Sequence, residues 1–122
     1  MSTIETLHPG ESRNHRAMSR KRSPDPVAFT RQELGQILKV YGQFVAAGEW
    51  RDYAIDSMRD VAVFSVFRRA SEAPLYRIEK RPKLARKQGA YSVVAANGAN
   101  LRRGQDLVQV LRVFDRQRMK LT

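Results

Sequence analysis

The spacing of the apolar residues changes twice along the chain. Residues 34–45 place them three and four positions apart, which is the spacing of an amphipathic helix. Residues 50–96 place them two positions apart or in short runs, as in strands, and residues 107–114 return to the helical spacing. This order predicts an α+β fold: an N-terminal helix, an antiparallel sheet and a C-terminal helix, with both helices packed on one face of the sheet.

Capping residues indicate where the first helix begins and ends. Thr30 stands three residues before Glu33, which is the pattern of a capping box, so the helix is predicted to begin at Arg31. Gly48 follows the last apolar residue and suits the left-handed position after a helix. A second helix is predicted over residues 105–118, because the apolar residues regain the helical spacing and basic residues load its far end.

The sheet is predicted to contain four strands, with a fifth left open. The four are residues 53–57, 60–68, 75–81 and 91–96, and the open candidate is residues 101–103. The second strand is apolar on both faces, which favours an interior position in the sheet. In the third, Tyr76 and Ile78 alternate with charged residues, so one face of that strand is predicted to be core and the other charged.

The net charge of +11 is concentrated in one quarter of the chain. Residues 74–104 hold eight basic side chains and a single acidic one, Glu79. Such a segment repels itself, and an anionic ligand would relieve that repulsion. The residues predicted to bind nucleic acid or another anion are Arg77, Arg81, Lys83, Arg86, Lys87, Arg102 and Arg103.

Residues 1–28 are predicted to form a disordered basic tail ahead of a single α+β domain over residues 29–122. The tail contains the turn-forming pair Pro9-Gly10, the cluster Pro24-Asp25-Pro26 and few large apolar residues. Ordering it would cost conformational entropy with little burial in return. Its basic residues suit either a solubilising tail or an arm that becomes ordered on an anionic partner.

The domain shows no pattern typical of catalysis or metal binding. The chain has no cysteine, and its two histidines, His8 and His15, lie in the predicted tail. No glycine-rich phosphate loop or GxSxG motif is present. Asp52, Asp56 and Asp60 recur every fourth residue, but on strands and turns we expect them to be solvated. The sequence therefore predicts a non-catalytic protein without a cofactor or metal.

The predicted function is phosphate contact with a nucleic acid, either RNA or DNA, with little sequence specificity. The element order is similar to that of the double-stranded RNA-binding domain, but the last helix lacks that module's lysine-rich start. Trp50, Tyr76 and Tyr91 could stack on bases, although their spacing is more typical of core aromatics. The alternative is a regulatory or adaptor protein that binds an acidic protein surface or a large assembly through the same charges. Exposed sheet edges leave the oligomeric state open.

Several short motifs resemble a known family. They are Phe29-Thr30-Arg31-Gln32-Glu33-Leu34, Trp50-Arg51-Asp52-Tyr53, Arg77-Ile78-Glu79-Lys80 and the Asn97-Gly98 turn before Leu107. Over residues 29–114 the chain resembles a family of short alphaproteobacterial proteins classed as a domain of unknown function. The resemblance implies a bacterial cytoplasmic protein and transfers no activity or site. A cytoplasmic location without membrane contact also agrees with the lack of an apolar run near the roughly 20 residues that cross a bilayer.

Overall fold

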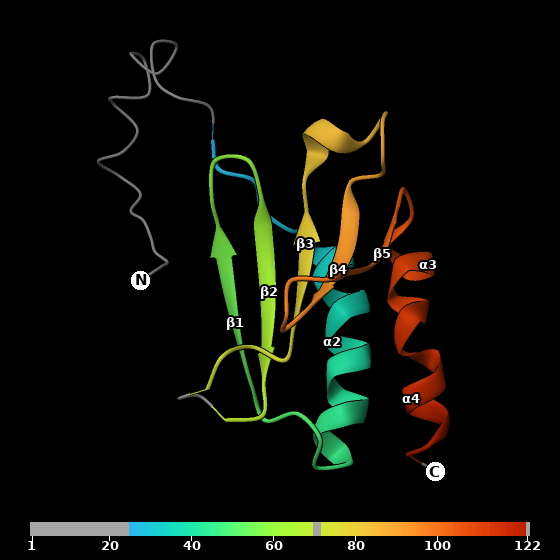
Figure 1. Ribbon diagram of the computed structural model, residues 1–122. Coiled ribbons are helices and arrows are strands. Elements are labelled where there is room, and N and C mark those ends of the chain that lie inside the picture. The colour runs from blue at the N-terminus through green and yellow to red at the C-terminus, as the bar shows by residue number, and fades with distance from the viewer. Residues whose placement is uncertain (1–24, 70–71, 122) are drawn as a thin grey trace, which may run out of the picture.

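The computed structural model describes residues 25–69 and 72–121, so the predicted tail up to residue 24 lies outside the described residues. Its elements are α2 (Arg31–Ala46), β1 (Asp52–Ser57), β2 (Ala62–Phe67), β3 (Tyr76–Lys80), η2 (Pro82–Leu84), β4 (Tyr91–Ala95), β5 (Asn100–Gly104), α3 (Leu107–Leu111), η3 (Arg112–Phe114) and α4 (Asp115–Met119). The predicted order of helix, antiparallel sheet and helix is confirmed (Figure 1).

The strands form one five-stranded sheet in the order β1-β2-β3-β4-β5. Each strand pairs antiparallel with the one that follows it in the sequence. All four predicted strands are present, and the fifth, which the sequence leaves open, is β5. A register shift between Val93 and Val94 interrupts its pairing with β4. The helices share one face of the sheet, so the other face is free of described helices (Figure 1).

The hydrophobic core lies between the helices and one face of the sheet. The strands contribute alternate residues, among them Phe64, Ile78 and Val93, and the helices contribute Phe44 and Phe114. Burying a side chain of this size stabilises the fold by about 1.5–3 kcal/mol. Because the strands alternate, the residues between these core positions project to the helix-free face.

The first helix begins and ends as the capping pattern predicts. The Glu33 N–H donates to Thr30 Oγ1 at 3.1 Å, and the Thr30 N–H donates to Glu33 Oε1 at 2.7 Å, which completes the capping box. Gly48, just after the helix, has a φ of 78°. The last residues of the predicted tail contact the domain, because the Val27 N–H donates to the Met58 carbonyl at 2.8 Å.

The C-terminal helix is not continuous, so the prediction of one helix over residues 105–118 is wrong in this respect. α3 passes into the single 3₁₀ turn η3 and then into α4. The β-branched Val108, Val110 and Val113 lower the helical propensity of this stretch. The tighter turn places Phe114, 1% exposed, against Trp50 with the ring centroids 5.3 Å apart. The 3₁₀ turn thus lies where helical propensity is low and where Phe114 packs into the core.

Candidate anion-binding face

Three arginines and one glutamate gather on the face of the sheet that no described helix covers. β3 contributes Arg77 and Glu79, and the chain continues directly into Arg81, so these side chains alternate with core residues such as Ile78. β5 contributes Arg103. We call Arg77, Glu79, Arg81 and Arg103 the arginine face.

Glu79 joins two of these arginines. Arg77 Nε donates to Glu79 Oε2 and Arg81 Nε donates to Glu79 Oε1, each at 3.3 Å. The Glu79 side chain is 10% exposed, whereas those of Arg77 and Arg81 are 36% and 39% exposed. A carboxylate with so little water contact is stable as an anion only beside cationic groups, and the two guanidinium groups, which donate through Nε, are these groups. No hydrogen bond within the described part of the chain uses their terminal Nη atoms, which leaves those donors for a ligand.

Arg103 extends the arginine face across the neighbouring strands. Glu79 pairs with Ser92 of β4, and Ser92 pairs with Arg103 of β5, so the three side chains form one row on the same face. Arg103 Nη1 donates to the Gly89 carbonyl at 3.2 Å. When the Asn100 side-chain amide is oriented so that its nitrogen donates to the Arg102 carbonyl, its oxygen accepts a hydrogen bond from Arg103 Nη2 at 3.1 Å. These contacts hold the guanidinium in place beside the row.

Arg102 does not belong to the arginine face. It pairs with Val93, a core residue, so its side chain starts from the helix side of the sheet, where it is exposed. The sequence groups Arg102 with Arg103 because it leaves open whether residues 101–103 form a strand. In a strand the two neighbours project to opposite faces, and the register with β4 determines which of them joins the arginine face.

The other three predicted residues lie in the connection between β3 and β4. Lys83 Nζ lies 3.1 Å from Asp60 Oδ1, but the lysine side chain is 81% exposed, so this ion pair is weak. Arg86 and Lys87 follow η2 and are exposed. The connection starts at the end of β3 from which Arg81 projects (Figure 1). It therefore continues the positive charge of the arginine face beyond the sheet.

The same face carries the opposite charge along β1. Asp56 pairs with Val63, and Val63 pairs with Glu79, so Asp56 shares the helix-free face with the arginine face. Asp52 lies four residues earlier on the same side. Both are exposed, as predicted. The sequence does not place these carboxylates on the arginine side of the sheet, because only the register of β1 determines it.

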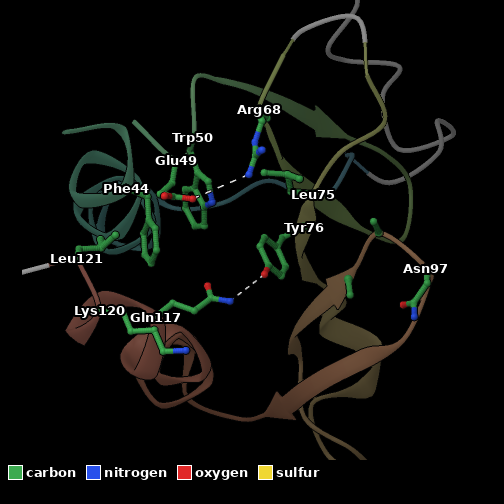
Figure 2. Close-up of a pocket in the computed structure, with 12 residues that line it drawn as sticks. Phe44, Glu49, Trp50, Arg68, Leu75, Tyr76, Asn97, Gln117, Lys120 and Leu121 are labelled. Carbon is green, nitrogen blue, oxygen red and sulfur yellow. Dashed lines mark hydrogen bonds and ion pairs between the residues drawn. The ribbon is translucent and has the colours of Figure 1, made fainter. Parts of the chain in front are cut away.

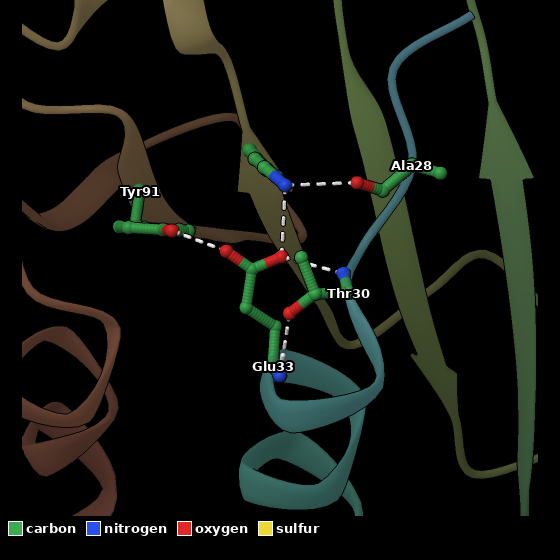
Figure 3. A network of polar contacts seen from close by, with 5 residues as sticks. Ala28, Thr30, Glu33 and Tyr91 are labelled. Carbon is green, nitrogen blue, oxygen red and sulfur yellow. Dashed lines mark hydrogen bonds and ion pairs between the residues drawn. The ribbon is translucent and has the colours of Figure 1, made fainter.

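Lys80 belongs to the same basic segment but lies on the opposite face. Its Nζ donates to Glu33 Oε1 and to the Ala28 carbonyl, each at 2.8 Å. The Tyr91 hydroxyl donates to Glu33 Oε2 (Figure 3). Since Glu33 also caps α2, these contacts hold the first turn of α2 against β3 and β4.

The protonation of this network follows from its burial and hydrogen bonds. Burial raises the pKa of Tyr91 to about 12, and the hydrogen bond to the Glu33 carboxylate acts in the same direction. Burial would also raise the pKa of Glu33, but hydrogen bonds from Lys80, Tyr91 and the Thr30 N–H outweigh it and hold that pKa below its ordinary value. Glu33 is therefore ionised at neutral pH and keeps Lys80 engaged inside the domain.

A family model matches residues 27–111, which span α2, the whole sheet and α3. The chain belongs to the family described as Protein of unknown function (DUF2794). The match confirms the resemblance to a family of unknown function and assigns no activity to the residues of this DUF2794 domain. No curated protein and no solved structure matches the chain.

The DUF2794 domain has an open cleft of about 660 Å³ at the start of β3, the end opposite Arg81. Glu49 Oε1 lies 4.0 Å from Arg68 Nη2 at its rim, and Gln117 Nε2 donates to the Tyr76 hydroxyl at 3.1 Å (Figure 2). The cleft is lined by Phe44, Glu49, Trp50, Arg68, Leu75, Tyr76, Ala95, Ala96, Asn97, Gln117, Lys120 and Leu121. Glu49 and Arg68 balance each other, and Lys120 is the one further charge among the described residues of the lining, which is too little to indicate a particular ligand.

The three aromatic residues considered for base stacking are engaged inside the DUF2794 domain. Trp50 is 3% exposed and stacks on Phe44 with the ring centroids 4.3 Å apart. Tyr76 packs edge-on against Phe114 at 5.1 Å, and the Tyr91 hydroxyl is bound to Glu33. The arrangement favours the core role that their spacing indicates.

Neither a membrane-spanning helix nor a cluster of metal-ligating side chains occurs within residues 25–69 and 72–121. Over this part of the chain, no helix is both long enough and apolar enough to span a membrane. The same residues hold no group of three or more histidine, cysteine, aspartate or glutamate side chains that could bind a metal ion.

Proposed function

We propose that this chain is a non-catalytic binding domain that contacts the phosphates of a nucleic acid with little sequence specificity. The observation that supports this most directly is the pairing of Arg77 and Arg81 with Glu79 through Nε. The pairing orients both guanidinium groups, so that their Nη donors can meet a ligand. Two parallel N–H donors match two phosphate oxygens, and an oriented guanidinium loses less entropy on binding than a free one.

The proposed contact surface runs from Arg103 across β3 to the connection between β3 and β4. Arg86 and Lys87 are exposed there and would follow the phosphate backbone beyond the edge of the sheet. Asp52 and Asp56 would repel phosphates, so the surface ends before β1.

The expected affinity is electrostatic, and it should therefore depend steeply on salt. Each neutralised phosphate of duplex DNA contributes about −0.9 to the slope of log K against log salt. Five contacting cations therefore give a slope of about −4.5 at most; they are Arg77, Arg81, Arg86, Lys87 and Arg103. Phosphate contacts carry no sequence information. We therefore expect similar affinities for unrelated sequences of the same length and strandedness.

The competing function is an adaptor that binds an acidic protein surface. Carboxylates also accept two hydrogen bonds from a guanidinium, so the arginine face alone fits both partners. Polyglutamate is a simple probe for an acidic protein surface, and it should compete with nucleic acid for the arginine face if charge alone determines binding. Comparing the two probes at equal charge separates the functions.

Fluorescence anisotropy tests the proposal with a labelled RNA and a labelled DNA duplex of about 16 nucleotides over a series of salt concentrations. Arg86→Gln combined with Lys87→Gln is expected to weaken binding at least about tenfold at low salt and to reduce the slope by about 2. Lys39→Gln combined with Arg116→Gln removes the same charge from exposed helix positions and should change the affinity less than about threefold. Absence of binding to both nucleic acids at about 20 mM salt would overturn the proposal, and binding of polyglutamate alone would favour the adaptor.

A further inference from the structure

β1 is an edge strand that the described structure leaves uncovered. All six of its residues are exposed. Figure 1 shows it at the side of the sheet away from α3 and α4, and no described strand pairs with its outer side. The other edge strand, β5, is contacted by α3. Uncovered strand edges can recruit further strands, and charges on an edge repel strands of like charge but not of opposite charge, so β1 is open to a partner strand of complementary charge.

The register shows which backbone groups of β1 point outward. The Met58 N–H donates to the Val61 carbonyl at 2.9 Å across the turn between β1 and β2. Along an antiparallel strand, residues that bond to one neighbour alternate with residues that face the other side. The even-numbered residues of β1 therefore bond to β2. The outward N–H and C=O groups belong to Tyr53, Ile55 and Ser57.

An apolar strip runs beside these outward groups on the helix side of the sheet. The side chains of Tyr53 and Ile55 are on this side, and the two residues are 46% and 42% exposed. The Tyr53 ring meets Tyr41 of α2 at a centroid distance of 5.0 Å. Leu38 and Val45 lie one turn before and one turn after Tyr41 on the helix, and each is 39% exposed. The strip is therefore shared between α2 and β1.

The other side of β1 is acidic. Asp52 and Asp56 project to the helix-free face, about 13 Å apart along the strand. An added strand with alternating basic and apolar side chains would place cations beside these carboxylates and apolar groups beside Tyr53 and Ile55. A second copy of β1 would instead bring four carboxylates to one face, which like-charge repulsion disfavours. The chemistry of the edge thus selects a basic and apolar partner strand.

We propose that β1 is a docking edge for an extended segment of a partner polypeptide whose side chains alternate between apolar and basic. The segment joins the sheet as a further strand and bonds to the outward groups of Tyr53, Ile55 and Ser57. Its apolar side chains cover the strip that Leu38 and Val45 border, and its basic side chains pair with the carboxylates on the other face. This mode of recognition, β-strand addition, takes affinity from the main chain and specificity from the alternate side chains. The edge is separate from the arginine face on β3 and β5, so the inference stands without the proposed nucleic-acid function.

Amide exchange measured by NMR on the full chain tests this docking edge. The probe is an acetylated and amidated hexapeptide of alternating lysine and valine, and the control peptide carries glutamate in place of lysine. Saturating probe is expected to slow exchange at Tyr53, Ile55 and Ser57 at least about tenfold, while Ala54 and Asp56, which bond to β2, change little. A purely electrostatic contact would not produce this alternation. The glutamate peptide is expected to leave all of these amides unchanged.

Two variants distinguish main-chain pairing from charge. Ile55→Pro removes one outward N–H and keeps the ladder with β2, because proline is tolerated where its nitrogen faces solvent. It is expected to bind the lysine peptide at least about tenfold more weakly while retaining the native circular dichroism spectrum. If that variant does not fold, Asp52→Lys combined with Asp56→Lys tests the same edge, because it should reverse the preference between the two peptides.

Three results would overturn the docking edge. The first is unchanged exchange at Tyr53, Ile55 and Ser57 at a saturating concentration of the lysine peptide. The second is protection confined to other strands. The third is concentration-dependent protection of the same three amides in the free chain, because the occupant would then be a second copy.

Discussion

Lys80 Nζ lies 2.8 Å from Glu33 Oε1, although the two residues are 47 positions apart in the chain. Both side chains are largely buried, at 16% and 13% exposure. The Glu33 carboxylate, which caps the first turn of α2, therefore also accepts a hydrogen bond from the ammonium group of Lys80 in β3 (Figure 3). Initiation of the helix and its docking on the sheet depend on the same group.

Lys80→Met is expected to lower the free energy of unfolding by about 2 kcal/mol. Hydrogen bonds to charged groups contribute about 1.5–3 kcal/mol, and the variant leaves the Glu33 carboxylate buried with fewer donors. Lys83→Met is the matched control, because the pair of Lys83 with Asp60 is exposed and its loss should cost less than about 0.5 kcal/mol. Urea denaturation measures both values. Equal losses in the two variants would contradict the anchoring role of Lys80.

Tyr91→Phe is expected to change the alkaline limb of the stability profile. The pKa of Tyr91 is raised to about 12 in the folded chain, against an ordinary value of 10.0. The stability that the neutral hydroxyl contributes is thus complete below pH 10 and is lost as the pH rises towards 12. Between these pH values the free energy of unfolding should fall more steeply in the wild type than in Tyr91→Phe, as measured by denaturation at each pH. A decline in Tyr91→Phe parallel to that of the wild type would contradict the role of the hydroxyl.

The Glu33 carboxylate contributes to the dependence of stability on pH at the acid end, in the direction opposite to Tyr91. Its pKa is lowered in the folded chain, so its contribution is present above the ordinary carboxyl value of 4.5 and is lost as the pH falls below it. Glu33→Gln should therefore flatten the decline of stability below about pH 4.5, as denaturation curves over that range would show. A decline parallel to that of the wild type would contradict the role of the carboxylate.

Local patterns predicted the elements of this fold because their determinants lie within a few residues. The capping box of Thr30 and Glu33 spans three positions, and the alternation around Ile78 places Arg77 and Arg81 on one face without reference to any other strand. The break in the C-terminal helix was not predicted, because the apolar spacing of residues 107–114 is continuous in the sequence and the contact of Phe114 with Trp50 is made across the core.

The candidate site was predictable only within one strand. Separating Arg102 from Arg103 requires knowing that β5 is a strand, which the sequence leaves open, and only its pairing with β4 shows that Arg103 is the one on the arginine face. The placement of Asp56 beside the same face requires the register of β1 with β2. Lys80 falls on the core side by alternation, but its partner Glu33 lies 47 positions away and leaves no local signal.

Gly89→Ala is expected to destabilise the domain by about 3 kcal/mol or more. Gly89 has a φ of 101°, and an added Cβ would lie 2.3 Å from the backbone carbon of Gly104. Gly98→Ala is the control, because its φ of 88° carries similar strain while its Cβ would meet open space. It should cost about 1–2 kcal/mol in thermal or urea denaturation. Similar losses in both would show that backbone strain alone limits position 89, without the close approach of Gly104 in β5 to the connection between β3 and β4.

Glu79→Gln separates the effect of the carboxylate on nucleic-acid affinity from its effect on the stability of the domain. The glutamine side-chain oxygen can still accept a hydrogen bond from one of the two arginines, so the loss of the negative charge is expected to outweigh the loss of orientation. The affinity for nucleic acid should therefore rise about threefold to tenfold at low salt. The free energy of unfolding should fall by about 1–2 kcal/mol, because both guanidinium groups lose a charged acceptor. Anisotropy and urea denaturation measure the two effects. Asp115→Asn removes the same charge from the helical layer and should leave the affinity nearly unchanged. Equal gains in the two variants would show that net charge, rather than the arginine face, sets the affinity, and weaker binding by folded Glu79→Gln would contradict the expected gain.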